Sequence, residues 1–140
     1  MKKKIIIISA AVLLLALGIV LFLVLSGPDV AEEPDEALES LLAAGYEDAL
    51  KIDGANLSHL GVGGLLCRVS GSRLEPGSEW IEIYYFKNSE AADEAWDAMQ
   101  RLAYSDFQDP TTHGSEFVCE KSGSIIWFGT ERAVEAACGK

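Results

Sequence analysis

The chain has 140 residues, a formal net charge of −11 and 49% hydrophobic residues, so it holds at most one ordinary domain and does not have the composition of a disordered tail. All 22 acidic residues fall at Asp29 or later, where they face 8 basic residues and give that part a net charge of −14. This charge argues against binding to nucleic acid or to anionic lipid, because both require clusters of Lys and Arg.

An uncharged apolar run follows the three basic residues Lys2, Lys3 and Lys4. It extends from Ile5 to Leu25, and a helix of that length is about 31 Å long, which matches the roughly 30 Å hydrocarbon core of a bilayer. We therefore predict a basic cytoplasmic segment over residues 1–4 and a single transmembrane helix, a signal anchor, over residues 5–25. Positive charge is retained on the cytoplasmic side, so the domain that follows is expected outside the cytoplasm, at the cell membrane.

The alternative for this segment is a secretory signal peptide cleaved after Ser26, which would release a secreted domain. The apolar core of a signal peptide usually runs about 7–15 residues, and this run is longer. Pro28 also lies close to the bond and makes it a poor cleavage site. The anchor is the favoured interpretation, and in both cases the domain is exported.

After the anchor, residues 26–35 are predicted to form a short, solvated acidic linker, and residues 36–140 the extracytoplasmic domain. Hydrophobic periodicity, turn residues and capping residues predict the elements of that domain. In chain order they are a helix over 34–45, a strand over 46–52, a helical turn over 56–60, strands over 65–70 and 80–86, a helix over 89–104, strands over 116–120 and 125–129, and a helix over 131–138. Thr130 is expected to cap the last helix, and Leu65, Cys67 and Val69 are expected to share one face of their strand.

This order does not alternate regularly enough for a doubly wound parallel sheet. It indicates a small α+β domain with an antiparallel or mixed sheet of about five strands and with helices packed mainly on one face.

Aromatic residues are the most informative feature of the predicted sheet. Trp80 and Tyr84 share a face of the strand over 80–86, and Trp127 lies on the apolar strand over 125–129. If helices cover only one face, the other face exposes aromatic side chains as a partner surface. The alternative is that these strands are central and buried on both sides.

The three cysteines, Cys67, Cys119 and Cys138, allow one disulfide in an exported domain. Cys67 with Cys119 is the pair to test, although a domain of this size can also bury free thiols. A catalytic thiol would need a base, and His113 lies six residues before Cys119. No recognisable catalytic, cofactor-binding or metal-binding motif accompanies that pair.

Three functional hypotheses follow. The leading one is a single-pass membrane protein whose exported domain is a non-enzymatic interaction module, which contacts a protein partner or a second copy through an aromatic sheet face. The second is an exported enzyme with a Cys119–His113 site. The third is a secreted domain released after Ser26.

Overall fold

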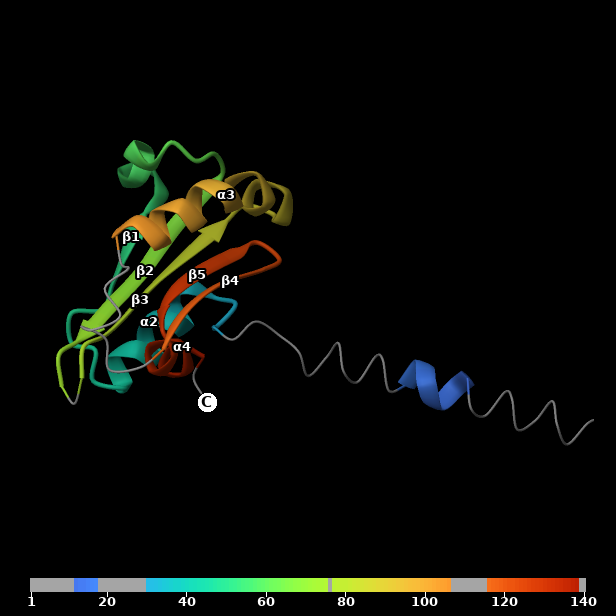
Figure 1. Cartoon of the computed structure of the whole chain (residues 1–140), viewed down its shortest axis with the longest axis horizontal. Coiled ribbons are helices and arrows are strands. Elements are labelled where there is room, and N and C mark those ends of the chain that lie inside the picture. Colours follow the sequence, from blue (N-terminus) through green and yellow to red (C-terminus); the bar gives the residue numbers. More distant parts are fainter. Residues whose placement is uncertain (1–11, 18–29, 76, 107–115, 139–140) are drawn as a thin grey trace, which may run out of the picture.

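Figure 1 shows the computed structural model, which describes residues 12–17, 30–75, 77–106 and 116–138. The folded part consists of an α+β domain, as the order of elements predicts. Its elements are α2 (Pro34–Ala43), β1 (Leu50–Asp53), the 3-10 helix η1 (Gly54–Leu60), β2 (Leu65–Arg73), β3 (Glu79–Phe86), α3 (Ser89–Asp106), β4 (Phe117–Ser122), β5 (Ile125–Thr130) and α4 (Glu131–Ala137).

The five strands form one antiparallel sheet in the order β1-β2-β3-β5-β4. The strand β5 lies between β3 and β4 because it forms a hairpin with β4 and also pairs with β3. Gly123 occupies the two-residue turn of that hairpin with a φ of 57°, which glycine adopts without steric cost. The predicted sheet of about five strands is confirmed, and it is antiparallel.

Helices cover both faces of the sheet, so the prediction that they pack mainly on one face is wrong. On one face α2 and α4 bury Ile81, Ile83 and Trp127; on the other α3 buries Tyr84 and Phe128. Figure 1 shows α3 on one side of the strands and α2 with α4 on the other. The physical reason is that the central strands β3 and β5 are apolar on both faces, and both faces therefore need cover.

A β-bulge at the start of β2 changes which side chains share a face. Leu65 pairs with Phe86 and Cys67 pairs with Tyr85, so Leu66 is an extra residue in β2. The bulge places Leu65 in the core beneath α3, whereas Cys67 and Val69 belong to the core beneath α2 and α4. The prediction that Leu65, Cys67 and Val69 share one face is wrong for Leu65, because alternation cannot reveal an inserted residue.

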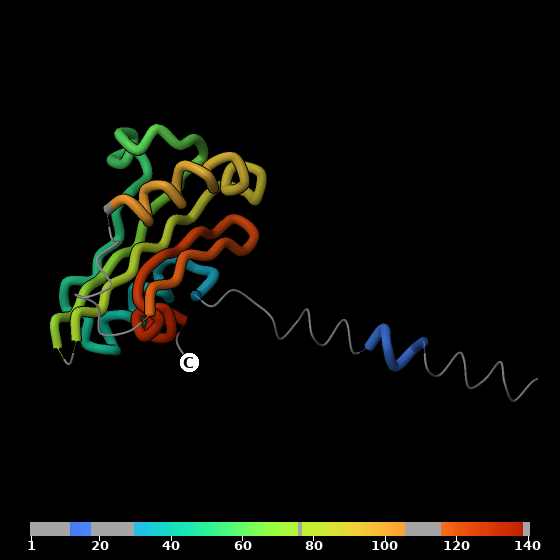
Figure 2. Tube along the Cα trace, in the orientation of Figure 1, coloured from blue at the N-terminus to red at the C-terminus, as the bar shows by residue number. Residues whose placement is uncertain are grey.

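The segment before α2 is part of the domain. Val30 and Ala31 are buried, the amide of Ala31 donates to the carbonyl of Ala137 at 3.2 Å, and the hydroxyl of Tyr85 donates to the carbonyl of Ala31 at 2.9 Å. Figure 2 shows this segment, in light blue, beside the red α4. The buried Val30 and Ala31 therefore do not belong to the solvated linker expected over 26–35, and residues 26–29 lie outside the described residues.

The predicted membrane span over residues 5–25 lies outside the described residues except for 12–17. These six residues are helical, and their large side chains are more than half exposed. Within the described ranges, no helix combines the length and the apolar character needed to cross a bilayer. The span stays a prediction from the sequence.

Candidate functional site

The candidate site lies on the part of the sheet face that α3 does not fill. The helix α3 packs over β3, β4 and β5, which leaves the β1 and β2 side of the same face more open. On β2 the polar residues Arg68, Ser70 and Ser72 point to this face, and the alternate residues Val69 and Gly71 face the opposite core. The polar alternation of β2 therefore matches the open part of the face.

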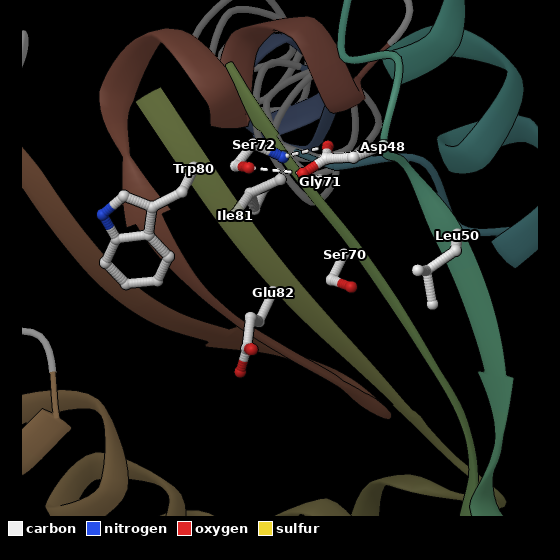
Figure 3. A pocket seen from close by; sticks show the side chains of 8 residues that line it. All are labelled: Asp48, Leu50, Ser70, Gly71, Ser72, Trp80, Ile81 and Glu82. Atoms are coloured by element: carbon white, nitrogen blue, oxygen red, sulfur yellow. Dashed lines mark hydrogen bonds between the residues drawn. The ribbon is translucent and has the colours of Figure 1, made fainter. Parts of the chain in front are cut away.

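A cavity of about 320 Å³ occupies this open part. Strand register brings its side chains together, because Leu50 lies opposite Ser70, Ser70 opposite Glu82, and Ser72 opposite Trp80. Figure 3 shows Trp80 and Leu50 on either side of Ser70. The complete lining is Asp48, Leu50, Ser70, Gly71, Ser72, Trp80, Ile81 and Glu82.

Asp48 fixes one wall of this cavity. It lies in the turn before β1 and accepts hydrogen bonds from both the backbone amide of Ser72, at 2.6 Å, and the Ser72 hydroxyl. These two bonds tie the turn to the end of β2. Both carboxylate oxygens of Asp48 therefore already have a partner in the folded domain.

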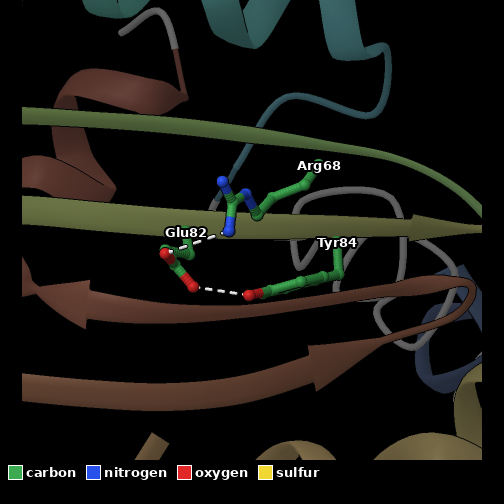
Figure 4. A network of polar contacts seen from close by, with 3 residues as sticks. All are labelled: Arg68, Glu82 and Tyr84. Atoms are coloured by element: carbon green, nitrogen blue, oxygen red, sulfur yellow. Dashed lines mark hydrogen bonds and ion pairs between the residues drawn. The ribbon is translucent and has the colours of Figure 1, made fainter. Parts of the chain in front are cut away.

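Glu82 forms the polar floor of the cavity and has two partners, as Figure 4 shows. Its Oε1 lies 3.5 Å from Nη1 of Arg68, and its Oε2 accepts a hydrogen bond from the hydroxyl of Tyr84. Burial, with a further contribution from Glu82, raises the pKa of Tyr84, so this phenol stays protonated and remains a donor. Glu82 is therefore held in place by one cation and one neutral donor.

The aromatic wall of the cavity is held by three residues, Phe117, Phe128 and Thr130. The ring of Trp80 lies 6.0 Å from the ring of Phe117 and 6.1 Å from that of Phe128. The hydroxyl of Thr130 contacts both the backbone amide and the backbone carbonyl of Trp80. Thr130 is the residue before α4, as predicted, but its side chain makes no capping bond to that helix. Its hydroxyl instead joins β5 to the start of β3.

The predicted aromatic surface is divided between two cores. Tyr84 and Trp127 are buried, on opposite faces of the sheet, and only Trp80 is partly exposed. The three side chains therefore form no common exposed patch on the domain, because α3 covers Tyr84 and the helices α2 and α4 cover Trp127. Trp80 is the one member of this set that lines the cavity.

The three cysteines are free thiols, and the disulfide considered between Cys67 and Cys119 is wrong. Cys67 belongs to the core under α2 and α4, and Cys119 to the core under α3. The strands β3 and β5 separate their strands, which places the two backbones roughly 14 Å apart, whereas a disulfide needs about 4.4–6.8 Å between Cα atoms.

Both strand thiols are poor nucleophiles. Burial raises the pKa of Cys67, and burial together with Glu120 raises the pKa of Cys119 to about 11. At neutral pH these groups are protonated, and the thiolate is the reactive form. His113, the proposed base for Cys119, lies outside the described residues.

A second cavity, of about 470 Å³, lies between η1 and α3. Its walls are mainly apolar, with Leu60, Val62 and Met99 among them. Its polar residues are all exposed and are His59, Arg101 and Ser105. Among the described residues, His59 and Arg101 form no network like that around Glu82, so the cavity on β1, β2 and β3 is the better candidate site.

Sequence reasoning missed most of the residues in the candidate site. The alternation of Arg68, Ser70 and Ser72 on β2 could have indicated an uncovered polar face, but Asp48 and Glu82 could be joined to it only through strand register. Among the described residues, no three His, Cys, Asp or Glu side chains come together as a metal site. No protein-family model, curated protein or solved structure matches the chain.

Proposed function

We propose that the protein is a single-pass membrane protein whose exported domain is a non-enzymatic binding module, and that the cavity on β1, β2 and β3 is its binding site. The apolar run over residues 5–25 is the anchor in this proposal, with the N-terminus in the cytoplasm. The ligand or partner then meets the domain outside the cytoplasm.

The position of the cavity relative to the start of the domain carries this proposal. The carbonyl of Ala31, in the first segment of the domain that the structure describes, accepts a hydrogen bond from the side chain of Tyr85 on the face of α2 and α4. Trp80 is on the opposite face, five residues earlier in β3, which corresponds to roughly 17 Å along the strand. The cavity is therefore at the other end and on the other face of the sheet, accessible to a ligand that approaches from outside the membrane.

The connection to the proposed anchor is short. Four residues, 26–29, separate Leu25 from the buried Val30, and a fully extended chain spans at most about 18 Å between these two positions. The domain is then kept near the bilayer with the Tyr85 end towards it. Such an arrangement suits a module that presents its binding site away from the membrane.

The state of the thiols supports a binding role over the alternative of a Cys119 enzyme. A nucleophilic cysteine usually has a lowered pKa, whereas burial raises the pKa of both Cys67 and Cys119. Asp48 and Glu82 in the cavity are instead held in fixed positions by hydrogen bonds and an ion pair, as is typical of a recognition site.

Site-specific photo-crosslinking in native membranes tests the proposal. The full-length chain carries a photoreactive phenylalanine at Leu50, which lines the cavity, or at Leu42, which lies on α2 and on the other side of the domain. The two side chains are matched in exposure, at 44% and 46%. We expect a specific adduct from Leu50, and its loss when Ser70→Tyr fills the cavity. Equal labelling from both positions, or none from Leu50, would contradict the proposal.

A further inference from the structure

The hydrogen-bonding groups of the cavity both donate and accept. The hydroxyl of Ser70 makes no hydrogen bond to any described residue, so it can both donate a hydrogen bond to a ligand and accept one from it. Glu82 keeps acceptor positions beyond the two that it uses for Arg68 and Tyr84. A ligand with groups that donate and accept at once, such as hydroxyls, suits this combination.

The charges of the cavity oppose simple ions. An anion would meet the carboxylates of Asp48 and Glu82 within an acidic domain, and repulsion disfavours it. A cation would have to compete with Arg68 for Glu82, and both oxygens of Asp48 are already engaged by Ser72. A neutral polar ligand avoids both the repulsion by the carboxylates and the competition with Arg68.

The walls of the cavity add apolar surface to this polar floor. Trp80 provides an aromatic wall held in place by Phe117 and Phe128, and Leu50 lies on the other side of Ser70. A flat molecule with apolar faces and a hydroxyl-bearing edge therefore matches the site. A peptide strand would also donate and accept, but it pairs along a sheet edge, whereas this cavity lies on the face of the sheet.

We propose that this cavity binds a pyranose ring of a neutral saccharide, with the C–H face of the ring against Trp80 and the ring hydroxyls bonded to Ser70 and Glu82. The inference rests on the proposed function and specifies its ligand class. The volume of about 320 Å³ is at the small end of the range for ligand sites, so it suits one short unit, free or at the end of a glycan.

The test uses the full-length chain in detergent micelles and ligand-observed NMR, because single small units are expected to bind weakly. The probes are the neutral disaccharides maltose, cellobiose and N,N′-diacetylchitobiose, with spermidine as a cationic probe. We expect saturation transfer to at least one disaccharide, with little dependence on salt. Ser70→Tyr and Trp80→Ala should each weaken it at least about tenfold.

Trp96→Ala is the matched control, because Trp96 is also a partly buried tryptophan packed on the core under α3 but does not line the cavity. Its binding should equal that of the parent chain. Circular dichroism establishes that each variant is folded. If Trp80→Ala unfolds, Ser70→Tyr still tests the inference, because residue 70 is at a partly exposed strand position where a larger side chain is tolerated.

Two results would overturn the inference. One is the absence of saturation transfer to all three disaccharides, or transfer that Ser70→Tyr leaves unchanged. The other is salt-dependent binding of spermidine that Ser70→Tyr abolishes, which would assign a cationic ligand to the cavity. In either case the Leu50 crosslink still tests the binding role separately, so a wrong ligand class can be distinguished from a wrong function.

Discussion

At the scale of single residues, backbone packing imposes the tightest limits. A Cβ added at Gly129 in β5 would lie 2.3 Å from the backbone carbonyl oxygen of Trp80 and 2.7 Å from the Cα of Ile81. Both are main-chain atoms of the neighbouring strand and cannot rotate aside. The close approach of β5 to β3 next to the candidate site therefore requires glycine.

We predict that Gly129→Ala lowers the free energy of unfolding by about 3 kcal/mol, the upper end of the usual range for overpacked sites. Gly63→Ala is the control, because an added Cβ there meets no atom within 4 Å, and it should change stability by less than about 0.5 kcal/mol. Urea unfolding of both variants measures the difference. Equal effects at the two positions would show that β3 and β5 can separate to admit a side chain.

The thiol of Cys119 provides a second prediction, on pH dependence. Because its pKa is about 11 in the folded chain against an ordinary value of 9.0, alkylation by iodoacetamide at pH 8 should be about a hundredfold slower than in urea. The folded state holds the proton more tightly, so this group stabilises the fold below about pH 9, and that contribution is lost as the pH rises towards 11.

A variant with Cys67→Ser and Cys138→Ser isolates the Cys119 signal in this measurement. The alkylation rate of the folded chain should rise through pH 10 and 11, whereas the rate in urea should level off earlier. A fast reaction at pH 7 would indicate an activated thiol and would favour the enzyme hypothesis over the binding module.

At the scale of elements, the segment before α2 links the domain to its proposed anchor. Its attachment depends on two bonds, from Tyr85 to the carbonyl of Ala31 and from the amide of Ala31 to Ala137. Burial raises the pKa of Tyr85, so its hydroxyl remains a donor at physiological pH. The segment is therefore positioned by a side chain from the sheet and by the end of α4.

We predict that Tyr85→Phe costs about 1 kcal/mol in stability, because it leaves the buried carbonyl of Ala31 without this donor. Hydrogen exchange at the amide of Ala31 should accelerate more than exchange in β3. Tyr104→Phe is the control, because Tyr104 is an exposed residue. It should leave the free energy of unfolding and the exchange rate at Ala31 unchanged. If exchange at Ala31 does not respond, another contact holds the segment.

At the scale of the whole molecule, the sign of the charge changes across the proposed span, from three lysines before it to a domain of −14 after it. A domain with this charge is repelled by anionic lipid headgroups, which favours a position near the bilayer but not adsorbed on it. The charge thus supports a domain that is tethered to the membrane without adhering to its surface.

We predict that the chain extracted from membranes retains residues 1–26, and that protease added outside intact cells digests the domain. Intact mass spectrometry and immunoblotting measure the two properties. A mature N-terminus at Gly27 would instead establish the secreted form. Such cleavage would leave the buried Val30 and Ala31 on the domain, so it would remove the anchor without removing the attached segment.

Local patterns in the sequence were sufficient to predict most elements and the fold class. The aromatic and β-branched residues of β3, and the apolar spacing of Ala92, Met99 and Ala103 in α3, determined strand and helix, because each depends on contacts close in the chain. Glycine and polar residues likewise marked the β4–β5 turn. The charge asymmetry and the apolar run are also properties of the sequence alone.

Tertiary structure decided what those elements cover and which side chains meet. Only the packing of α2 and α4 opposite α3 buried Trp127 and Tyr84 on separate faces, and only the bulge at Leu66 moved Leu65 to the core under α3. The cavity joins Asp48 to Ser72, and Ser70 to Glu82, across 12 to 24 positions of sequence. Contacts between residues so far apart in the sequence depend on strand register and on which helix covers which face of the sheet. No local sequence pattern encodes either of these.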